Sequence, residues 1–394
     1  MIERRVFGTV ERMHPTGRRP ALPALTGLRA VAAVWVVLFH YREDLLALVP
    51  SLSPLDALMR AGYLGVDLFF PLSGFVLAYT YADRMRGFTR LGTGDFVRNR
   101  FARVWPVHVL TLHVDLAIAA VIGTLGVAAD GHRRTAQAYV ENLAMVHTWF
   151  NDRPSFNSPA WSISSEWFAY LLAPLLFVAV ARVRRASSAL LLAALSYAVM
   201  LAVFATQALP NGNLEQMFYV RILGEFVGGM LLCLAWVRGG ARLGRLVVVL
   251  PLTLAVLALV PSAADGHYWA APALGLGVAA LAGSSGWITR ALSWPVVVAA
   301  GEASYALYMT HLLVQPLVRP ARVWAQGSGG ASALVLGGFV VALAAMAWLV
   351  HTKVERPARR LLQAPRREEA PGPAEPTADG VDREPELVGA SERP

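Results

Sequence analysis

The chain has 394 residues, of which 56% are hydrophobic and only 15% are charged, and its formal net charge is +9. A soluble protein carries about 25% charged residues, whereas the mean hydropathy here is +0.49. The composition therefore indicates an integral membrane protein and excludes an ordinary soluble enzyme. The positive charge does not require a nucleic-acid partner, because arginines beside membrane spans attract anionic lipid headgroups.

Apolar runs recur along the chain, and most are near the length of about 20 residues that a helix needs to cross a bilayer. Ten spans are expected, at 28–48, 62–81, 104–127, 160–180, 187–208, 214–236, 246–263, 267–282, 294–317 and 332–351. The eighth is the shortest of the ten. The sequence thus predicts an all-α integral membrane protein, a polytopic bundle of about ten transmembrane helices.

Basic residues gather in alternate loops. With the N-terminus inside, the cytoplasmic segments hold about three times as many Arg and Lys residues as the opposite loops, as the positive-inside rule requires. We therefore expect both termini in the cytoplasm and the chain in the plasma membrane. The expected regions are a cytoplasmic N-terminal segment (1–23), a transmembrane domain (24–358) and a basic, then acidic and Pro-rich, disordered tail (359–394).

Arg29 and His40 both fall in the first predicted span, which we expect to be one helix over 28–48. An Arg at mid-membrane costs about 2.5–3.5 kcal/mol even on lenient scales. With Arg29 at the cytoplasmic face, a rise of ~1.5 Å per residue places His40 about 16 Å deeper. This pair is expected to be functional, and a hydrogen-bonded structural role is the alternative for His40.

Other polar side chains fall in four further spans. They are Asp67, Ser73, Trp161, Glu166, Arg221, Glu225, Tyr305 and His311. Asp67 and Glu166 lie near span ends, where contact with water or headgroups is the alternative to function. Arg221 and Glu225 are four residues apart on one helix face, which favours a structural ion pair. Trp161 would equally suit the interfacial aromatic belt.

Arginines also gather near the cytoplasmic mouth of the predicted bundle. Arg100 and Arg103 join Arg29 there, which suggests a site for a phosphate-bearing molecule, whereas Arg98 is expected to be a topology signal. We expect the histidines in loops and at span ends to be exposed; these are His14, His132, His147, His267 and His351. The single cysteine, Cys233, excludes an internal disulfide framework, and no metal site is expected.

Seven segments in order resemble the membrane-bound acyltransferase-3 family of integral membrane O-acyltransferases. The first, 25–40, carries the family's pattern of Arg, ten residues and His, here Arg29 and His40. The others are 65–75, 100–106 with its RxxR pattern, 161–166, 221–230, 304–311 and 354–357. Pro71 is a small departure within the second segment. Some relatives carry a fused hydrolase-like domain, and the resemblance here is to the stand-alone type.

The resemblance implies an acyl donor, acetyl-CoA or another acyl-CoA, as co-substrate rather than a tightly bound cofactor. It also implies a hydroxylated acceptor, usually a sugar. Neutral His40 would act as general base, with Asp67 or Glu166 orienting it or contacting the acceptor. Arg29, Arg100 and Arg103 would hold the CoA phosphates. The expected substrate-binding residues are Ser73, Trp161, Glu225, Tyr305 and His311.

The acceptor class stays open between a cell-envelope glycan and the sugar of a macrolide-type secondary metabolite. Direct transfer and an acyl-enzyme route are both compatible with the residues, and the oligomeric state is open. A transporter or flippase of an anionic or acylated metabolite is the alternative function, because a basic mouth can also collect such a substrate. The sequence lacks the internal repeats that many transporters show, which disfavours this alternative.

Overall fold

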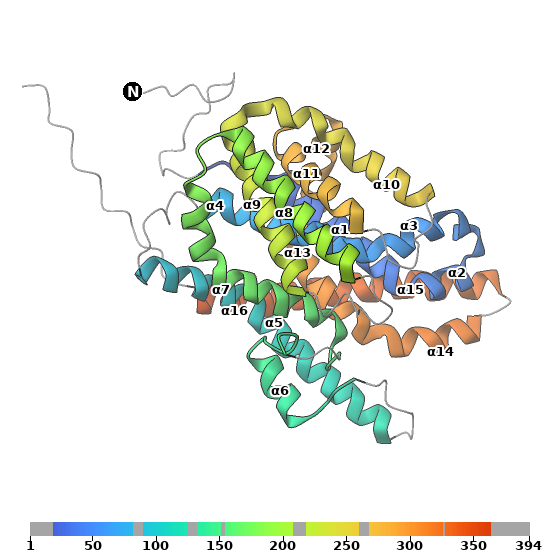
Figure 1. Ribbon diagram of the computed structural model, residues 1–394. Coiled ribbons are helices and arrows are strands. Elements are labelled where there is room, and N and C mark those ends of the chain that lie inside the picture. The colour runs from blue at the N-terminus through green and yellow to red at the C-terminus, as the bar shows by residue number, and fades with distance from the viewer. Residues whose placement is uncertain are drawn as a thin grey trace, which may run out of the picture. The chain divides into compact units, whose positions relative to one another are not determined.

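The computed structural model describes residues 19–81, 90–124, 132–150, 154–207, 218–259, 268–325 and 328–363. The regular elements of these residues are all helical (Figure 1). The α-helices are α1 (Pro23–His40), α2 (Arg42–Leu48), α3 (Asp56–Arg60), α4 (Gly65–Tyr81), α5 (Arg90–Thr124), α6 (Ala136–Leu143), α7 (Trp161–Ala181), α8 (Ala186–Gln207), α9 (Phe218–Gly239), α10 (Val249–Leu259), α11 (Ala271–Ala282), α12 (Trp287–Leu292), α13 (Pro295–Thr310), α14 (Gln315–Ala325), α15 (Gly329–Val350) and α16 (Arg356–Leu362).

Short 3₁₀ segments and one π-helical turn join several of these helices. The 3₁₀ segments are η1 (Pro50–Leu55), η2 (Ala61–Leu64), η3 (Ser158–Ala160), η5 (Gly240–Val248), η6 (Tyr268–Ala270) and η7 (His311–Val314). The π turn η8 (His351–Glu355) connects α15 to α16. Most of the N-terminal segment and residues 364–394 of the expected tail lie outside the described residues.

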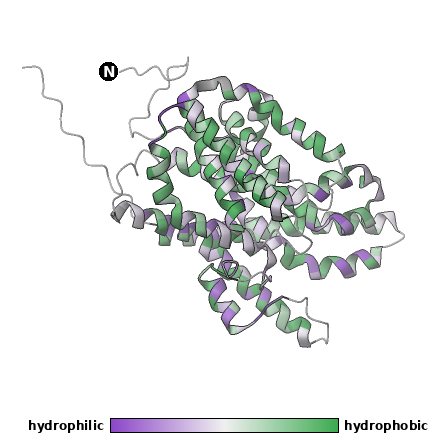
Figure 2. Ribbon diagram, in the orientation of Figure 1, coloured by the Kyte–Doolittle hydropathy of each residue, from purple (hydrophilic) through white to green (hydrophobic). Residues whose placement is uncertain are grey.

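Eight stretches of the described chain are long and apolar enough to cross a membrane. Figure 2 shows that apolar residues predominate along these helices. Two further apolar stretches, Leu243–Leu259 and Tyr268–Ala282, are shorter, and they correspond to the predicted spans 246–263 and 267–282. The prediction of an all-α polytopic membrane bundle is confirmed, with eight full-length spans and two shorter apolar helices.

Large apolar side chains cover the outer surfaces of α8 and α15. Examples are Leu191, Leu195, Leu334, Val341 and Leu349, each more than half exposed. A soluble monomer rarely exposes apolar patches of this extent. In a bilayer these side chains would meet lipid tails instead of water, so the surface agrees with a membrane location.

The expectation of one helix over 28–48 is wrong, because α1 ends at His40 and α2 begins at Arg42. Tertiary contacts of Tyr41 explain the break. Its hydroxyl donates to the carbonyl of His311 at 2.5 Å, and its ring packs 4.4 Å from that of Phe339. Neither contact is visible in the local sequence, which has no Gly or Pro at this position.

The span expected over 294–317 is present as one apolar stretch, Pro295–Ala325, but it is not one continuous α-helix. Helix α13 ends at Thr310, and the 3₁₀ segment η7 separates it from α14. Helices α1 and α13 pack along each other. Their ends meet, because His40 closes α1 and His311 begins η7, and the two rings are in contact. The two unexpected breaks therefore occur at one place in the bundle.

Helix α5 begins at Arg90, well before the expected span at 104–127. Arg100 and Arg103 were expected in a loop, and they lie instead on a continuous helix, three residues apart and so on neighbouring positions of one face. The length of the apolar run could not reveal that the helix begins at Arg90, because the residues between Arg90 and the apolar run are largely polar.

Helices α4 and α9 form a close backbone contact in the interior of the bundle. A methyl group added at Gly74 of α4 would lie 2.0 Å from the carbonyl oxygen of Phe226. One added at Gly229 of α9 would lie 2.1 Å from the carbonyl oxygen of Pro71. Small residues at such a crossing let two membrane helices approach. This contact fixes α4, which carries Asp67 and Ser73, against α9, which carries Arg221 and Glu225.

Candidate active site

His40 lies half-buried at the last position of α1. Its Nδ1 atom is 2.9 Å from the carbonyl oxygen of Val36 and 3.3 Å from Nε2 of His311. The imidazoles of His40 and His311 meet edge to face, with centroids 4.9 Å apart. The ring of Phe39 also packs against the imidazole of His40, with centroids 5.0 Å apart. His40 is therefore held by a second histidine, and not by Asp67 or Glu166.

His311 is completely buried. Its Nδ1 atom lies 2.6 Å from the carbonyl oxygen of Tyr308. The ring of Tyr308 packs 5.9 Å from the imidazole of His311, and its hydroxyl donates to the carbonyl of Pro159 at 3.0 Å. We expected His311 to contact substrate, and the structure places it behind His40 instead, with both ring nitrogens engaged.

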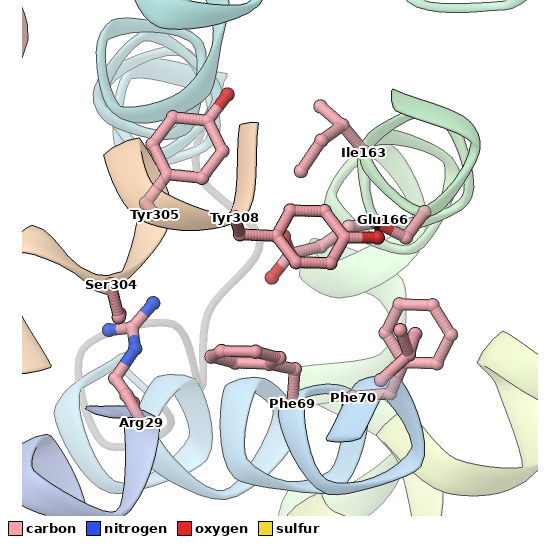
Figure 3. A pocket seen from close by; sticks show the side chains of 10 residues that line it. Arg29, Phe69, Phe70, Ile163, Glu166, Ser304, Tyr305 and Tyr308 are labelled. Carbon is pink, nitrogen blue, oxygen red and sulfur yellow. Dashed lines mark hydrogen bonds between the residues drawn. The ribbon is translucent and has the colours of Figure 1, made fainter. Parts of the chain in front are cut away.

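A pocket lies between α1, α4, α7 and α13 (Figure 3). The side chains that line it are Arg29, Val66, Phe69, Phe70, Ser162, Ile163, Glu166, Ser304, Tyr305 and Tyr308. His40 is not among them, and Tyr308 lies between the pocket and His311. Three predicted site residues thus share one pocket: Arg29, Glu166 and Tyr305.

Arg29 reaches into this pocket toward Ser304 (Figure 3). Its Nε atom is buried and has no hydrogen-bond partner, and no carboxylate within the described residues pairs with its guanidinium. A buried charge is normally paired because its desolvation is costly. The pocket therefore holds a cation that is suited to an anionic ligand.

Arg100 and Arg103 have different surroundings. The guanidinium of Arg100 lies over the rings of Tyr81, Phe96 and Tyr170 at 5.6–5.9 Å, and none of the carboxylates in the described chain pairs with it. Arg103 instead donates to the buried carboxylate of Glu355, which also hydrogen-bonds His351 at 2.8 Å. Of the three arginines expected to bind the donor, Arg103 already has a countercharge.

Glu166 lies on the α7 side of the pocket and accepts two hydroxyl hydrogen bonds. Ser73 of α4 donates to its Oε1 at 2.7 Å, and Tyr170 donates to the same oxygen. The hydroxyls of Ser73 and Tyr170 are 3.3 Å apart. The structure thus brings Ser73 and Glu166 together, a contact that was not predicted from the sequence, and adds Tyr170.

Asp67 belongs to a separate buried cluster. Both of its carboxylate oxygens accept hydrogen bonds from Arg221, at 2.9 and 2.5 Å. The expected ion pair between Arg221 and Glu225 is therefore corrected: the partner of Arg221 is Asp67. Trp161 and Tyr268 lie over the guanidinium at 5.0 and 5.2 Å.

Glu225 lies beside this cluster, and its carboxyl oxygens are buried without a hydrogen-bond donor from the described residues. The guanidinium of Arg221 is hydrogen-bonded to Asp67, and Glu225 is a second buried carboxyl group near it. The cluster joins α4, α7 and α9 through three predicted site residues, Asp67, Trp161 and Glu225.

Two histidines that we expected to be exposed are buried. His147 stacks parallel to His108 at 5.7 Å, and burial, the nearby His108 and Arg133 lower the pKa of His147 to about 3. His351 bonds Glu355 as described above. Tertiary packing covers both side chains. Their sequence positions in a loop and at a span end could not show this. His14 and His267 lie outside the described residues.

Sequence reasoning did not select Tyr308, Phe69 or Ser162 as site residues, yet all three line the pocket. All three stand within segments that carry the family resemblance, so their position in those segments was the available signal. Within the described residues there is no group of three or more His, Cys, Asp or Glu side chains that could hold a metal ion.

Comparisons with known proteins identify the family of the chain. The model of the acyltransferase domain of the acyltransferase 3 family matches residues 22–351. "Acyltransferase MdmB" of Streptomyces mycarofaciens is 30% identical, and the match covers 86% of this chain and 92% of MdmB. "Putative peptidoglycan O-acetyltransferase YrhL" of Bacillus subtilis (strain 168) is 24% identical, over 78% of this chain and 51% of YrhL.

"Protein 2 in picA locus" of Rhizobium radiobacter is 36% identical over 36% of this chain and 75% of that protein. No solved structure matches the chain significantly. The family model spans the helices that carry the histidine pair, the pocket and the Asp67 cluster. The chain is therefore a multi-pass membrane protein that belongs to the acyltransferase 3 family, whose members transfer acyl groups other than aminoacyl groups.

Proposed function

We propose that the protein is an O-acyltransferase that moves an acyl group, acetyl in the simplest case, from acyl-CoA to a hydroxyl of a carbohydrate or glycosylated acceptor. The observation that carries this proposal is the guanidinium of Arg29, which no carboxylate of the described residues pairs with, in a pocket whose lining residue Tyr308 packs against His311 of the His40–His311 pair. An acyl-CoA is an anion with a reactive thioester at the far end of a flexible arm. The cation of Arg29 would bind the anionic part of the donor, and the imidazole of His40 would assist the reaction at the thioester.

Arg29 and Arg100 are assigned to the donor, because neither has a carboxylate partner within the described chain. Arginine binds phosphate oxygens through paired N–H groups. Arg103 shares its charge with Glu355, so it contributes less to donor binding and more to holding α5 against η8. The positive-inside bias favours a cytoplasmic entrance for the donor in the plasma membrane.

His40 is assigned as the general base, because a neutral imidazole can take the acceptor's hydroxyl proton at neutral pH. Glu166 lines the pocket and is assigned to acceptor contacts. The hydroxyl protons of Ser73 and Tyr305 are donated to Glu166 and to the carbonyl of Val104. Either hydroxyl would have to turn to stabilise the thioester oxygen. Asp67 is assigned a structural role with Arg221.

The names of two relatives bear on the acceptor. YrhL is named for peptidoglycan O-acetylation, and MdmB is named only as an acyltransferase. We therefore keep two acceptor classes, cell-envelope glycans and glycosylated secondary metabolites of the macrolide type, within the broader class of carbohydrate acceptors.

The test uses the purified full chain in lipid nanodiscs with acetyl-CoA and a panel of both acceptor classes. Acceptor-dependent release of free CoA thiol, with one acetyl group added to the acceptor by mass spectrometry, is expected. His40→Ala should abolish this release while the protein still inserts and elutes as a single species. Binding of acyl-CoA without thiol release by any panel member would instead favour a transporter, and His40→Ala with full activity would overturn the assignment of the base.

A further inference from the structure

We propose that His311 is a positioning residue that holds the proton of neutral His40 on Nδ1, so that Nε2 of His40 presents the lone pair to the acceptor hydroxyl. This inference rests on the proposed function, in which His40 is the general base. It assigns His311 a role behind the base, in place of the substrate contact expected from its sequence position.

The tautomer of His311 follows from its carbonyl partner. Nδ1 of His311 lies 2.6 Å from the carbonyl oxygen of Tyr308. A carbonyl oxygen can only accept a hydrogen bond, so Nδ1 carries the proton. In a neutral imidazole the other nitrogen is then an acceptor. Nε2 of His311 therefore faces His40 with a lone pair.

The tautomer of His40 follows in the same way. Its Nδ1 atom faces two acceptors, the carbonyl oxygen of Val36 at 2.9 Å and Nε2 of His311 at 3.3 Å. Neither can donate, so the proton of neutral His40 is on Nδ1 and is shared between them. Nε2 of His40 makes no hydrogen bond to the residues that the structure describes. This nitrogen is free to accept a proton.

His311 is anchored well enough to impose this arrangement. Its backbone carbonyl accepts the hydroxyl of Tyr41 at 2.5 Å, and its imidazole packs beside the ring of Tyr308. The side chain is fully buried. It cannot contact an acceptor while both ring nitrogens are engaged, so it acts only through His40. The breaks of α1 at His40 and of α13 at Thr310 bring the two rings together.

Each proton and each bond of the proposed acyl transfer can be assigned to the acceptor, the thioester and His40. As the acceptor oxygen attacks the thioester carbonyl, its proton moves to Nε2 of His40 and a new C–O ester bond forms. The C–S bond then breaks, its electron pair leaves on sulfur, and the proton on Nε2 passes to the CoA thiolate. Nδ1–H of His40 stays hydrogen-bonded to His311 throughout. His311 neither gains nor loses a proton, and it steadies the imidazolium that forms in between.

Two substitutions separate this role from packing. His311→Gln places a side-chain amide near the position of Nε2 and can still accept from His40. His311→Phe keeps an aromatic ring but removes the acceptor. We expect His311→Phe to lower kcat by about 100-fold or more, within the range of general-base contributions, with the KM for acetyl-CoA within about twofold. His311→Gln should recover most of that loss through the retained acceptor.

If His311→Phe does not insert, His311→Asn replaces it, because its shorter side chain can reach the Tyr308 carbonyl but not Nδ1 of His40. The second readout is the ¹⁵N NMR spectrum of histidine-labelled protein, with the His40 signals assigned by their loss in His40→Ala. The wild type should show the proton on Nδ1, and His311→Phe should show increased Nε2–H.

The outcomes distinguish this inference from the proposed function. Equal kcat values for His311→Phe and wild type, with His40→Ala inactive, would overturn the role of His311 and leave acyl transfer intact. Equal losses in His311→Gln and His311→Phe would mean that only packing matters, which also overturns it. The NMR signature needs no acceptor or activity, so an Nε2–H tautomer in the wild type would contradict the inference even if the acceptor stays unknown.

Discussion

Arg221 of α9 binds both carboxylate oxygens of Asp67 of α4, at 2.9 and 2.5 Å, inside the helix bundle. Both side chains are almost completely buried. Removing one partner of such a pair leaves the other charge buried and unpaired, at a cost of about 3–5 kcal/mol. The pair therefore serves to hold α4 against α9 rather than to orient His40.

We expect Asp67→Asn to lower thermal stability in detergent strongly, because Arg221 then loses its carboxylate partner. The matched control is Glu302→Gln, which breaks the ion pair with Arg356 where both side chains are nearly half exposed. Exposed pairs contribute about 0–1 kcal/mol, so this variant should unfold close to the wild-type temperature. Similar unfolding temperatures for the two variants would contradict the structural role of Asp67.

Arg29→Gln should raise the KM for acetyl-CoA by about 10- to 100-fold, since a hydrogen bond to a charged group contributes about 1.5–3 kcal/mol. Steady-state thiol release across donor concentrations measures this effect. Arg98→Gln is the charge-matched control, because Arg98 is exposed and donates to the carbonyl of Leu362. A KM that changes equally in both variants would show that only the overall positive charge matters.

Gly74→Ala should destabilise the protein, because the new methyl group would lie 2.0 Å from a backbone oxygen of α9. The two helices would have to separate, and overpacking of this kind typically costs about 1–3 kcal/mol. Gly337→Ala is the control, because the space beside Gly337 of α15 is open. Alanine favours a helix over glycine by roughly 1 kcal/mol, so the control should be neutral or stabilising. The unfolding temperatures of the two variants test this prediction, and equal temperatures for Gly74→Ala and Gly337→Ala would contradict it.

The stability of the protein should depend on pH through His147, which lies between membrane spans. Burial, His108 and Arg133 lower its pKa from 6.5 to about 3 in the folded chain. Between these values the unfolded chain binds a proton that the folded chain does not, so stability rises with pH. The contribution is fully present above about pH 6.5 and is lost as the pH falls toward 3.

Unfolding temperatures measured from pH 7 to pH 4 test this expectation. The slope should be smaller in His147→Phe, which keeps a ring beside His108 and has no titratable group. His113→Phe serves as the control, because His113 is exposed on α5. An unchanged slope in His147→Phe would contradict the assignment.

Several features of the site could be predicted from the chain alone. The hydrogen bond between Ser73 and Glu166, at 2.7 Å, was not among them, because the two residues were expected at different depths. Arg29 and Glu166 were both selected because charges are rare in apolar spans, and they line one pocket. The pairing of Arg221 could not be predicted, because Glu225 is its neighbour on the helix and Asp67 is 154 residues away.

The sequence by itself determined the class of this protein: a bundle of apolar helices with a few ionisable side chains placed inside it. Composition and span length suffice for this, because each helix satisfies its own backbone in lipid. Only the tertiary structure decided that α1 and α13 break where His40 meets His311, and that Asp67 binds Arg221. Which side chains pair across helices depends on which helix faces meet. The sequence pattern of one helix does not show which helices lie beside it.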